Sequence, residues 1–443
     1  MKRVAVIGSG IAGLFAAWML SEPGRRARVT LFEANHYVGG HAHTVDVDLP
    51  DASGQVVRHG VDTGFLVFNH RTYPNLLRLF EQLGVPTAPS DMSFSVQSVA
   101  DRLEWCGSSL DTVFAQRRNL LNPRFVGMLR ELLRFNRVTT ELARQGSEAE
   151  LDQPIGAFLD AQGFSDTFRR WYFLPMVACI WSCPTEQMLQ FPVATLIRFC
   201  HNHGLLQVTD RPQWHTVRGG SHEYVRRMLP RIPDVRLRQP VLALRPEVDV
   251  RGGLGGVTVV SRSGSERFDE VVLACHADQA LALLGDQASA DERTLLGAIG
   301  FHPNRAVLHT DTGLLPKRPR AWAAWNYEQA VAAGGESRAV CLHYLINRLQ
   351  PLPFRQEVIV SLNPVREPRP DAVLAEFDYA HPVFDRAAIA AQGRLHELQG
   401  RRGLWFCGAW TGYGFHEDGL KSAQQVVAGL QASWQCGDER LAA

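Results

Sequence analysis

MKRVAVIGSGIAGLFAAWMLSEPGRRARVTLFEANHYVGG, residues 1–40, is the stretch that decides the fold. It predicts in turn a strand, a glycine turn, an apolar helix, a second strand and an acid, at 2–7, 8–13, 14–20, 29–32 and Glu33. A G-x-G-x-x-G turn between a strand and a helix is typical of a dinucleotide-binding unit with a parallel sheet. The sequence therefore predicts an α/β protein whose first unit binds a dinucleotide.

The residues of the glycine turn have separate roles in such a unit. Gly8 permits the tight turn after the strand, and Gly10 lets a diphosphate approach the backbone. Gly13 lets the helix pack closely on the sheet. The phosphates would then lie at the positive N-terminus of the helix, beside Ile11 and Ala12.

Glu33 follows Gly13 by twenty positions. A carboxylate at this distance accepts hydrogen bonds from the adenosine ribose hydroxyls, and Ala34 adjoins that contact. A glutamate here also disfavours a ribose that carries a 2′-phosphate.

A glycine pair follows the acid at Gly39 and Gly40, with His41 next. This pair resembles the extended N-terminal motif of the flavin-containing amine oxidase superfamily, which includes amine oxidases, protoporphyrinogen oxidases and phytoene-type desaturases. The resemblance implies a non-covalent FAD cofactor whose diphosphate and flavin end lie against this turn. In the superfamily an arginine commonly follows the pair, where this chain has His41.

Two further segments resemble the superfamily in its contacts with FAD. The stretch from Asp62 to Val67 resembles a turn that passes beneath the flavin ring, which implies contacts at Gly64, Phe65 and Leu66. Val241 occupies the position whose backbone meets the adenine edge.

The segment from Gly408 to Gly419 resembles the C-terminal FAD motif of the same superfamily. A helix is predicted over 421–434, and the free N–H groups of Phe415, His416 and Glu417 would precede it. Such groups at a helix start stabilise the negative charge of a reduced flavin.

The resemblance implies two interleaved domains. The FAD-binding Rossmann-like domain would comprise residues 1–75, 216–300 and 386–443, and an α+β substrate domain of mixed sheet and helices would comprise 76–215 and 301–385. The composition changes near residue 111, because 111–205 is helical in pattern and rich in Phe, Trp, Leu and Arg. Strands expected in the sheet beneath the substrate lobe are 306–310, 321–327, 339–345 and 357–362.

Composition excludes several classes of function for these 443 residues. The net charge of +1 gives no overall field to attract nucleic acid. No run of 18 apolar residues occurs, so we expect no membrane span. The first strand is predicted from residue 2, so we expect no signal peptide. The eight cysteines form no C-x-x-C pair, so we expect a cytoplasmic protein with reduced thiols and no metal site. The oligomeric state is left open.

Residues 123–137 predict a basic amphipathic helix, with Phe125 and Met128 among its apolar side chains and Arg130 and Arg134 among its cations. One interpretation is a helix packed on the core with solvated arginines. The other is a peripheral contact with the inner face of a membrane.

No nucleophile elbow, metal-binding set or P-loop is present in the sequence. The flavin would supply the chemistry, so the candidate catalytic residues are those that could tune or orient it, namely His416, Tyr413 and His215. A purely structural contact at the helix start is the alternative role for His416.

Two enzyme hypotheses compete. A flavin amine oxidase acting on an amine usually has a lysine in the first strand of the substrate sheet, where this chain reads Asn304-Arg305-Ala306-Val307 and has no lysine. The missing lysine, the aromatic residues and the basic helix favour a desaturase or dehydrogenase that removes hydride from an apolar, lipid-type substrate such as a fatty-acyl chain. The chain also resembles a bacterial branch of amine-oxidase-like flavoproteins associated with cyclopropane-type fatty-acid modification. A non-catalytic flavin-binding partner protein and an NAD(P) dehydrogenase are further alternatives.

Overall fold

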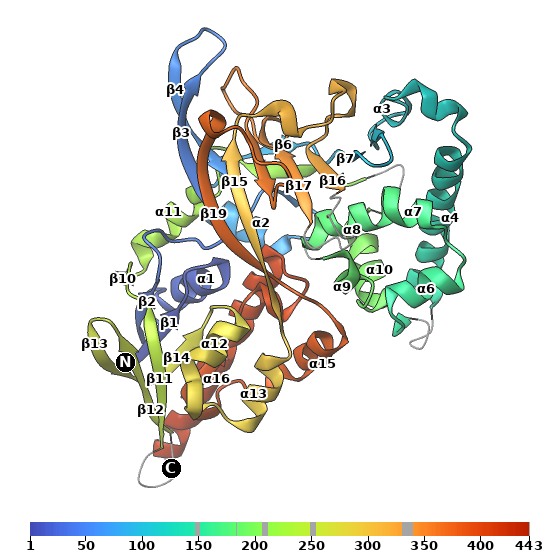
Figure 1. The fold of residues 1–443 in the computed structure, drawn as a ribbon. Coiled ribbons are helices and arrows are strands. Elements are labelled where there is room, and N and C mark those ends of the chain that lie inside the picture. Colours follow the sequence, from blue (N-terminus) through green and yellow to red (C-terminus); the bar gives the residue numbers. More distant parts are fainter. Residues whose placement is uncertain (147–150, 183, 206–210, 249–253, 330–339, 443) are drawn as a thin grey trace.

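The computed structural model describes residues 1–146, 151–182, 184–205, 211–248, 254–329 and 340–442. The chain forms a Rossmann-type lobe, a large mixed sheet and a lobe of helices (Figure 1). Strands of the first two parts alternate along the sequence, so the chain crosses between them several times.

A parallel sheet of five strands gathers three distant parts of the chain. Its order is β10 (Asp234–Arg236), β2 (Ala27–Phe32), β1 (Lys2–Ile7), β14 (Glu270–Leu273) and β20 (Leu404–Phe406). The inner strands are buried apolar runs, as expected for a parallel sheet covered on both faces. The predicted α/β class is confirmed.

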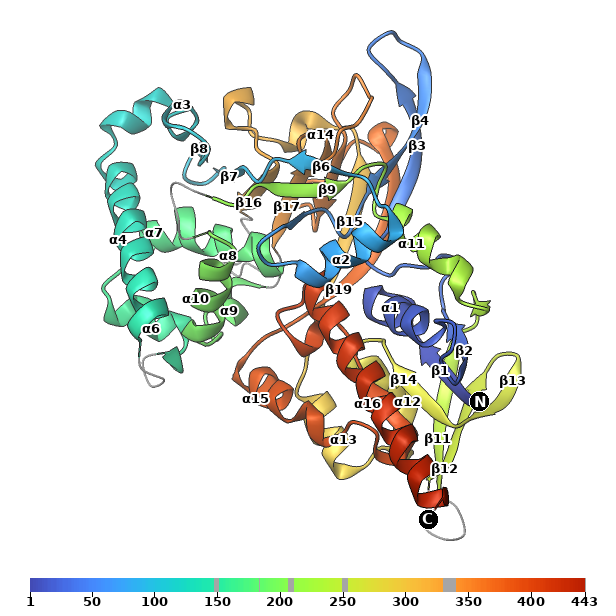
Figure 2. The same cartoon turned by 180° about the vertical axis from the view of Figure 1, so that it is seen from behind.

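Two layers cover this sheet. Val4 and Val6 face a core that includes α1 (Ile11–Leu20) and α16 (His416–Ala442), which pack against each other (Figure 2). Ala5 and Ile7 face the other core, because successive side chains of a strand point to opposite faces. That second layer comprises β11 (Val241–Val248), β12 (Leu254–Ser261), β13 (Gly264–Phe268), α12 (Ala277–Leu284), α13 (Ala290–Gly297) and α15 (Arg386–Arg394).

A seven-stranded sheet lies above the Rossmann-type lobe in Figure 1. Its order is β19 (Val373–Pro382), β15 (Phe301–His309), β18 (Ile359–Leu362), β17 (Cys341–Leu345), β16 (Trp325–Gln329), β7 (Phe94–Ser98) and β8 (Leu103–Cys106). Only β16 and β7 pair in parallel; the other neighbours are antiparallel. This is the mixed sheet expected of a substrate domain.

Smaller elements connect the two sheets. They are the hairpin β3 (Thr44–Pro50) and β4 (Val56–Asp62), the sheet β5 (Phe68–Asn69), β9 (Trp214–Val217) and β6 (Thr87–Ser90), and the helices α2 (Pro74–Leu83), α11 (His222–Met228) and α14 (Ile346–Leu349).

The helical lobe is built around aromatic rings that pack edge to face or at a tilt. Phe135 lies 5.4–5.7 Å from the ring centroids of Phe164, Phe168 and Phe173. The helices are α3 (Leu110–Val113), α4 (Pro123–Gln145), α6 (Ile155–Ala161), α7 (Asp166–Phe168), α8 (Leu174–Trp181), α9 (Thr185–Met188) and α10 (Val193–Asn202), with a 3-10 helix at Arg117–Leu121 and a π-helix at Arg169–Phe173. Within the described ranges, every helix is too short or too polar to span a bilayer.

Several predicted elements have different limits in the structure, and two of these differences have a visible cause. The strand expected over 321–327 begins only at Trp325, because the Asn326 side chain bonds both the N–H and the C=O of Ala323 and bends the chain there. The last helix begins at His416 instead of residue 421, because the Asp418 carboxylate accepts the N–H groups of Tyr413 and Phe415 and caps the first turn.

Candidate functional site

The glycine turn between β1 and α1 brings the helix against the strand. A Cβ on Gly13 would lie 2.0 Å from the carbonyl oxygen of Gly8, and Gly8 itself has φ +97°. A Cβ on Gly10 would meet nothing within 4 Å. Open space therefore lies at the N-terminus of α1, beside Ile11 and Ala12, where backbone N–H groups favour an anion.

Glu33 ends β2 and its carboxylate is held in place by the backbone around it. Oε2 accepts hydrogen bonds from the N–H and the hydroxyl of Ser9, at 3.0 and 2.5 Å, and Oε1 accepts from the N–H of Asn35 at 2.8 Å. A carboxylate has about four acceptor positions, so one remains for a ribose hydroxyl. The exposed Ala34 adjoins it, and the backbone N–H of Gln239, just before Val241, donates to the Glu33 carbonyl.

The glycine pair packs directly on the first glycine turn. Gly39 forms a parallel bridge with Gly10, and its N–H donates to the Ser9 carbonyl at 3.1 Å. A Cβ on Gly40 would lie 2.9 Å from the Cα of Gly10. Gly39 and Gly40 have φ of +126° and +58°, which favour glycine, so both glycine signals of the sequence belong to one structure.

His41 lies next to this structure within a group of aromatic rings. Its ring is 5.0 Å from Tyr379, 5.3 Å from His381 and 6.5 Å from His276. Burial and the neighbouring histidines lower the pKa of His41 well below its usual value, so the ring is neutral. Its Nε2 is buried and has no hydrogen-bond partner among the described residues. Such an atom is costly unless a bound group supplies the partner.

The segment predicted to pass beneath the flavin contacts both His41 and the C-terminal motif. A Cβ on Gly64 would lie 2.3 Å from the His41 carbonyl, which also accepts the N–H of Phe65 at 2.7 Å. The Phe65 ring stacks on His416 with 3.7 Å between centroids. Leu66 follows in the core.

The C-terminal segment is fixed against the N-terminal helix. The N–H of Gly408 donates to the Ser422 hydroxyl at 3.0 Å. A Cβ on Gly419 would lie 2.8 Å from Ile11 Cγ2, so α16 passes α1 at close range there. The two ends of the sequence thus meet beside the open space at Gly10.

The side chain of Glu417 binds protein backbone at the start of α2. Its carboxylate accepts the N–H groups of Asn75 and Leu76 at 3.1 Å and the Asn75 side-chain amide at 2.6 Å. The first turn of α2 has no other side-chain cap, so this carboxylate compensates its positive end. Any flavin contact at residue 417 would therefore use its N–H group.

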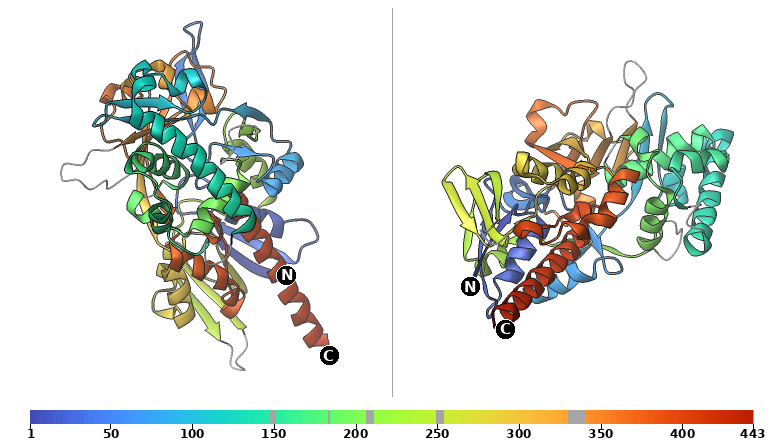
Figure 3. Two further views of the ribbon diagram at one scale, coloured as in Figure 1. Left: turned by 90° about the vertical axis from the view of Figure 1, so that its right-hand side faces the viewer. Right: turned by 90° about the horizontal axis from the view of Figure 1, so that it is seen from below.

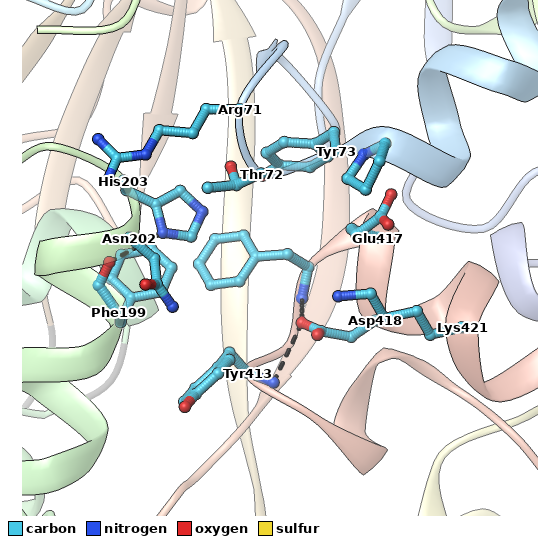
Figure 4. Close-up of a pocket in the computed structure, with 12 residues that line it drawn as sticks. Arg71, Thr72, Tyr73, Phe199, Asn202, His203, Tyr413, Glu417, Asp418 and Lys421 are labelled. Carbon is cyan, nitrogen blue, oxygen red and sulfur yellow. Dashed lines mark hydrogen bonds between the residues drawn. The ribbon is translucent and has the colours of Figure 1, made fainter.

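A pocket of about 290 Å³ opens where α2 and α16 begin and α10 ends (Figure 4). Phe199, Tyr413 and Phe415 give it aromatic walls, and the exposed Arg71 and Lys421 lie at its margin.

The three candidate catalytic residues lie in different surroundings. His416 is buried, its Nε2 is 3.0 Å from the Tyr224 hydroxyl, and burial lowers its pKa to about 3. Tyr413 lines the pocket. His215 lies in β9 with its ring 4.3 Å from His70 and 6.0 Å from Phe68. The structure thus places His416 beside Phe65 and leaves His215 in a separate contact; their catalytic roles stay predictions.

A polar cluster also occurs on the seven-stranded sheet, although the sequence predicts no metal site. Glu328, Cys341 and His343 have possible ligand atoms within 4.8 Å of one another. Each of these groups already has a partner. His343 lies 3.0 Å from Glu328 and 3.5 Å from the Cys341 thiol, Arg366 pairs with Glu328 at 3.1 Å, and Ser361 bonds His343 at 2.7 Å. Burial alone would lower the pKa of His343, but the stronger combined effect of Cys341 and Glu328 raises it above its usual value, to about 9. We assign this cluster to the stability of the sheet.

Residues 11–317 match the family of flavin-containing amine oxidoreductases. The chain belongs to that family. Its cofactor is FAD, and it stands among the flavin-dependent oxidoreductases.

Two proteins that act on carotenoids according to their names are similar to parts of this chain. The carotenoid phi-ring synthase of Streptomyces griseus is 29% identical over 293 residues, which are 61% of this chain and 52% of that protein. The 1-hydroxycarotenoid 3,4-desaturase of a Flavobacterium species is 32% identical over 105 residues, 24% of this chain and 18% of that protein. The chain spans about half the length of the first relative and less of the second.

The cyclohexylamine oxidase of Brevibacterium oxydans has a similar fold. Its structure aligns with a TM-score of 0.70 at 16% identity, over 98% of this chain and 99% of that one. At this identity the likeness supports the fold alone.

The residues around the two glycine turns fit FAD. The open space at Gly10 would admit the diphosphate, and Glu33 retains an acceptor position for the ribose. Among the described residues, His41 Nε2 has no hydrogen-bond partner, which a bound group could supply. The individual cofactor contacts stay predictions, as do the domain limits.

Sequence reasoning missed the partners of His41 and His416. Tyr379 and His381 alternate on β19 and so point to one face, and the Tyr379 hydroxyl bonds His43 and Thr63 at 2.9 and 2.8 Å. Tyr224 lies in α11, whose sequence suggested only a helix. The Tyr-x-His spacing in a strand was the available signal for the first pair.

Proposed function

We propose that this chain removes hydride from an apolar, lipid-type substrate such as a fatty-acyl chain, in the manner of a desaturase or dehydrogenase. FAD, when bound, supplies the hydride acceptor. The residues of the chain would bind the apolar substrate, orient it and exclude water.

The observation that carries this proposal is that both carboxylates at the start of α16 already accept hydrogen bonds from backbone N–H groups. Glu417 caps α2, and Asp418 accepts the N–H groups of Tyr413 and Phe415 at 3.1 Å. Burial also raises the pKa of Asp418 to about 6, which weakens it as a partner for a cation. A substrate ammonium would need a carboxylate or an aromatic cage to replace its water, and these carboxylates are already occupied.

The side chains of the seven-stranded sheet are a second argument for the proposal that the substrate is apolar. Trp325, Tyr327, Leu342 and Tyr344 share the face opposite Glu328 and His343, and the Trp325 and Tyr344 rings lie 4.9 Å apart. This face packs toward α8 of the helical lobe. Two relatives are named for reactions of carotenoids, which are also apolar.

The strand that contains Asn304 also differs from that of a typical amine oxidase, because it lacks the lysine. The Asn304 side chain is buried, its Nδ2 lies 2.8 Å from His381 Nδ1, and its oxygen accepts from Asn363 at 2.7 Å. The strand where the resemblance places a lysine has none, and at Asn304 it carries a neutral amide that is already hydrogen-bonded. This amide can orient His381, but it cannot hold a positive charge.

Anaerobic reduction of the flavin tests the proposal. Purified protein would be mixed with fatty-acyl lipids, carotenoid precursors and amines in turn, and the visible flavin absorbance followed. We expect bleaching by one apolar class and none by simple amines. Bleaching by amines alone would favour the amine oxidase hypothesis, and a flavin that no class reduces would favour a non-catalytic partner protein.

A further inference from the structure

The outer edge of the helical lobe has an unusual concentration of exposed apolar side chains. Of the eleven large hydrophobic side chains exposed in the described structure, five lie between residues 99 and 133. They are Val99 (67% exposed), Leu110 (80%), Leu120 (53%), Leu121 (89%) and Leu133 (58%). Single exposed hydrophobic residues are normal, but several on one side of a molecule indicate a docking surface.

These residues come from neighbouring elements. Val99 lies in the turn between β7 and β8, and the carbonyl of Arg102 in that turn accepts the Gln116 side chain at 3.0 Å. Leu120 and Leu121 end the 3-10 helix that Gln116 precedes, and Leu133 lies on α4. Together these elements form the side of the molecule farthest from the parallel sheet (Figures 1 and 3). We call this surface the outer edge.

The outer edge is also strongly basic. Residues 110–137 contain six arginines against Asp111 and Glu131, a net charge of +4, whereas the whole chain has +1. The remainder of the chain therefore has a net charge of −3. Arg124, Arg130 and Arg137 are exposed. Basic charge around exposed leucines is complementary to an anionic lipid surface.

The structure moves the possible membrane contact from the apolar side of residues 123–137 to the opposite side of α4. The apolar side chains expected to face lipid, such as Phe125 and Met128, are buried in the lobe. The opposite side of α4 presents Arg130, Leu133 and Arg137, which share one face at a spacing of three and four residues.

We propose that the outer edge docks on an anionic lipid bilayer. Val99 at the turn and the exposed leucines of the helices would enter the interfacial region, and the surrounding arginines would lie at the level of the lipid phosphates. A pocket of about 350 Å³ opens beside Leu121, with Arg102, Arg118 and Asp101 in its wall. Arg170 pairs with the Asp101 carboxylate at 3.1 Å, so the two pocket arginines remain for the phosphates. The proposal concerns where the protein acts and does not depend on which substrate it oxidises.

Vesicle sedimentation tests this surface in the full-length, FAD-loaded protein. We expect binding to phosphatidylglycerol–phosphatidylcholine vesicles that weakens as salt rises, and little binding to phosphatidylcholine alone. The double variants Leu120→Gln/Leu121→Gln and Arg124→Gln/Arg130→Gln should each lower the partition coefficient about tenfold or more. A matched control is Leu242→Gln/Arg245→Gln, which changes an exposed leucine and arginine on β11 and should bind as the wild type does.

Flavin content and thermal unfolding should be unchanged in all three double variants, because the altered side chains are exposed. Equal binding to neutral and anionic vesicles would overturn the proposal. Unchanged binding in both outer-edge variants would do the same. A wild-type dimer that these variants convert to monomer would show instead that the outer edge joins two copies of the chain.

Discussion

The rings of Phe65 and His416 stack with 3.7 Å between their centroids and 20° between their planes. Phe65 follows β4 and His416 begins α16, so the contact joins segments from opposite ends of the sequence. Tyr224 adds a hydrogen bond to His416 Nε2 at 3.0 Å. This arrangement holds a neutral histidine between the two segments that the resemblance assigns to the flavin.

A pair of variants separates the structural and chemical roles of His416. Tyr224→Phe removes the hydrogen bond and should lower the free energy of unfolding by about 1 kcal/mol, with flavin reduction unchanged. His416→Phe retains a ring that can stack on Phe65 and also removes the imidazole. We expect it to slow anaerobic flavin reduction about tenfold or more beyond the Tyr224→Phe variant. Equal reduction rates in the two variants would leave His416 with a structural role only.

Gly10 and Gly13 should respond oppositely to substitution. A side chain at Gly10 enters open space, so Gly10→Leu should fold normally and lose FAD, whose diphosphate it displaces. Gly13→Ala places a Cβ 2.0 Å from the Gly8 carbonyl and should destabilise the fold by more than about 2 kcal/mol. Thermal unfolding of the FAD-free proteins and visible absorbance after desalting measure the two effects. Normal FAD content in Gly10→Leu would refute the placement of the diphosphate.

The sequence was sufficient for the Rossmann-type lobe because its signals are local. The turn from Gly8 to Gly13, the acid Glu33 and the glycine pair each have a steric or charge requirement that few residues meet. The structure brings the two glycine signals into contact through the Gly10–Gly39 bridge. The α/β class and the mixed second sheet followed from the same segments.

The remaining features depend on contacts between distant residues. Glu417 resembles a flavin-contacting residue in sequence, yet its carboxylate caps α2, more than 300 positions earlier. Residues 123–137 have one amphipathic pattern whichever side faces the core, so the pattern could not say that Phe125 is buried and Leu133 exposed. Tyr224 carries no local signal of a site, and Tyr379 carries only the Tyr-x-His spacing that it forms with His381.

The cap formed by Glu417 can be tested separately from cofactor binding. Glu417→Ala removes the acceptor for the N–H groups of Asn75 and Leu76, and we expect a loss of about 2–3 kcal/mol in the free energy of unfolding. Glu22→Ala, which removes an exposed carboxylate paired with Arg25, should cost under about 1 kcal/mol. FAD content should persist in both, because any contact at residue 417 uses the backbone. Loss of FAD from a folded Glu417→Ala protein would assign the carboxylate itself to the cofactor.

His41 should matter more to the FAD-bound protein than to the free one. His41→Phe preserves an aromatic ring near Tyr379 and removes the buried Nε2, which has no hydrogen-bond partner in the part of the chain that the structure describes. The FAD-free variant should be as stable as the wild type, or more stable by about 1 kcal/mol. Added FAD should raise its unfolding temperature less than it raises that of the wild type. An equal rise would show that His41 does not contact the cofactor.

Acid should destabilise the protein before its surface carboxylates titrate. Burial lowers the pKa of many of the histidines, among them His43, His203, His309 and His381, whose pKa falls to about 4, and His416, whose pKa falls to about 3. The unfolded chain protonates these side chains near pH 6.5, whereas the folded chain keeps them neutral, so their contribution to stability is present above pH 6.5 and is lost as the pH falls towards 4. Each histidine contributes a slope of up to about 1.4 kcal/mol per pH unit.

Two buried carboxyls have the opposite effect in part of this range. The pKa values of Asp62 and Asp418 are raised to about 6, chiefly by burial, so their ionisation costs stability above pH 6 and that cost is relieved below it. The histidines outweigh the two carboxyls, and urea unfolding from pH 7.5 to 4.5 should show a net loss. His203→Gln should flatten the slope by about 1 kcal/mol per pH unit, and the exposed His396→Gln should not change it. A slope that His203→Gln leaves unaltered would mean that His203 titrates normally in the folded protein.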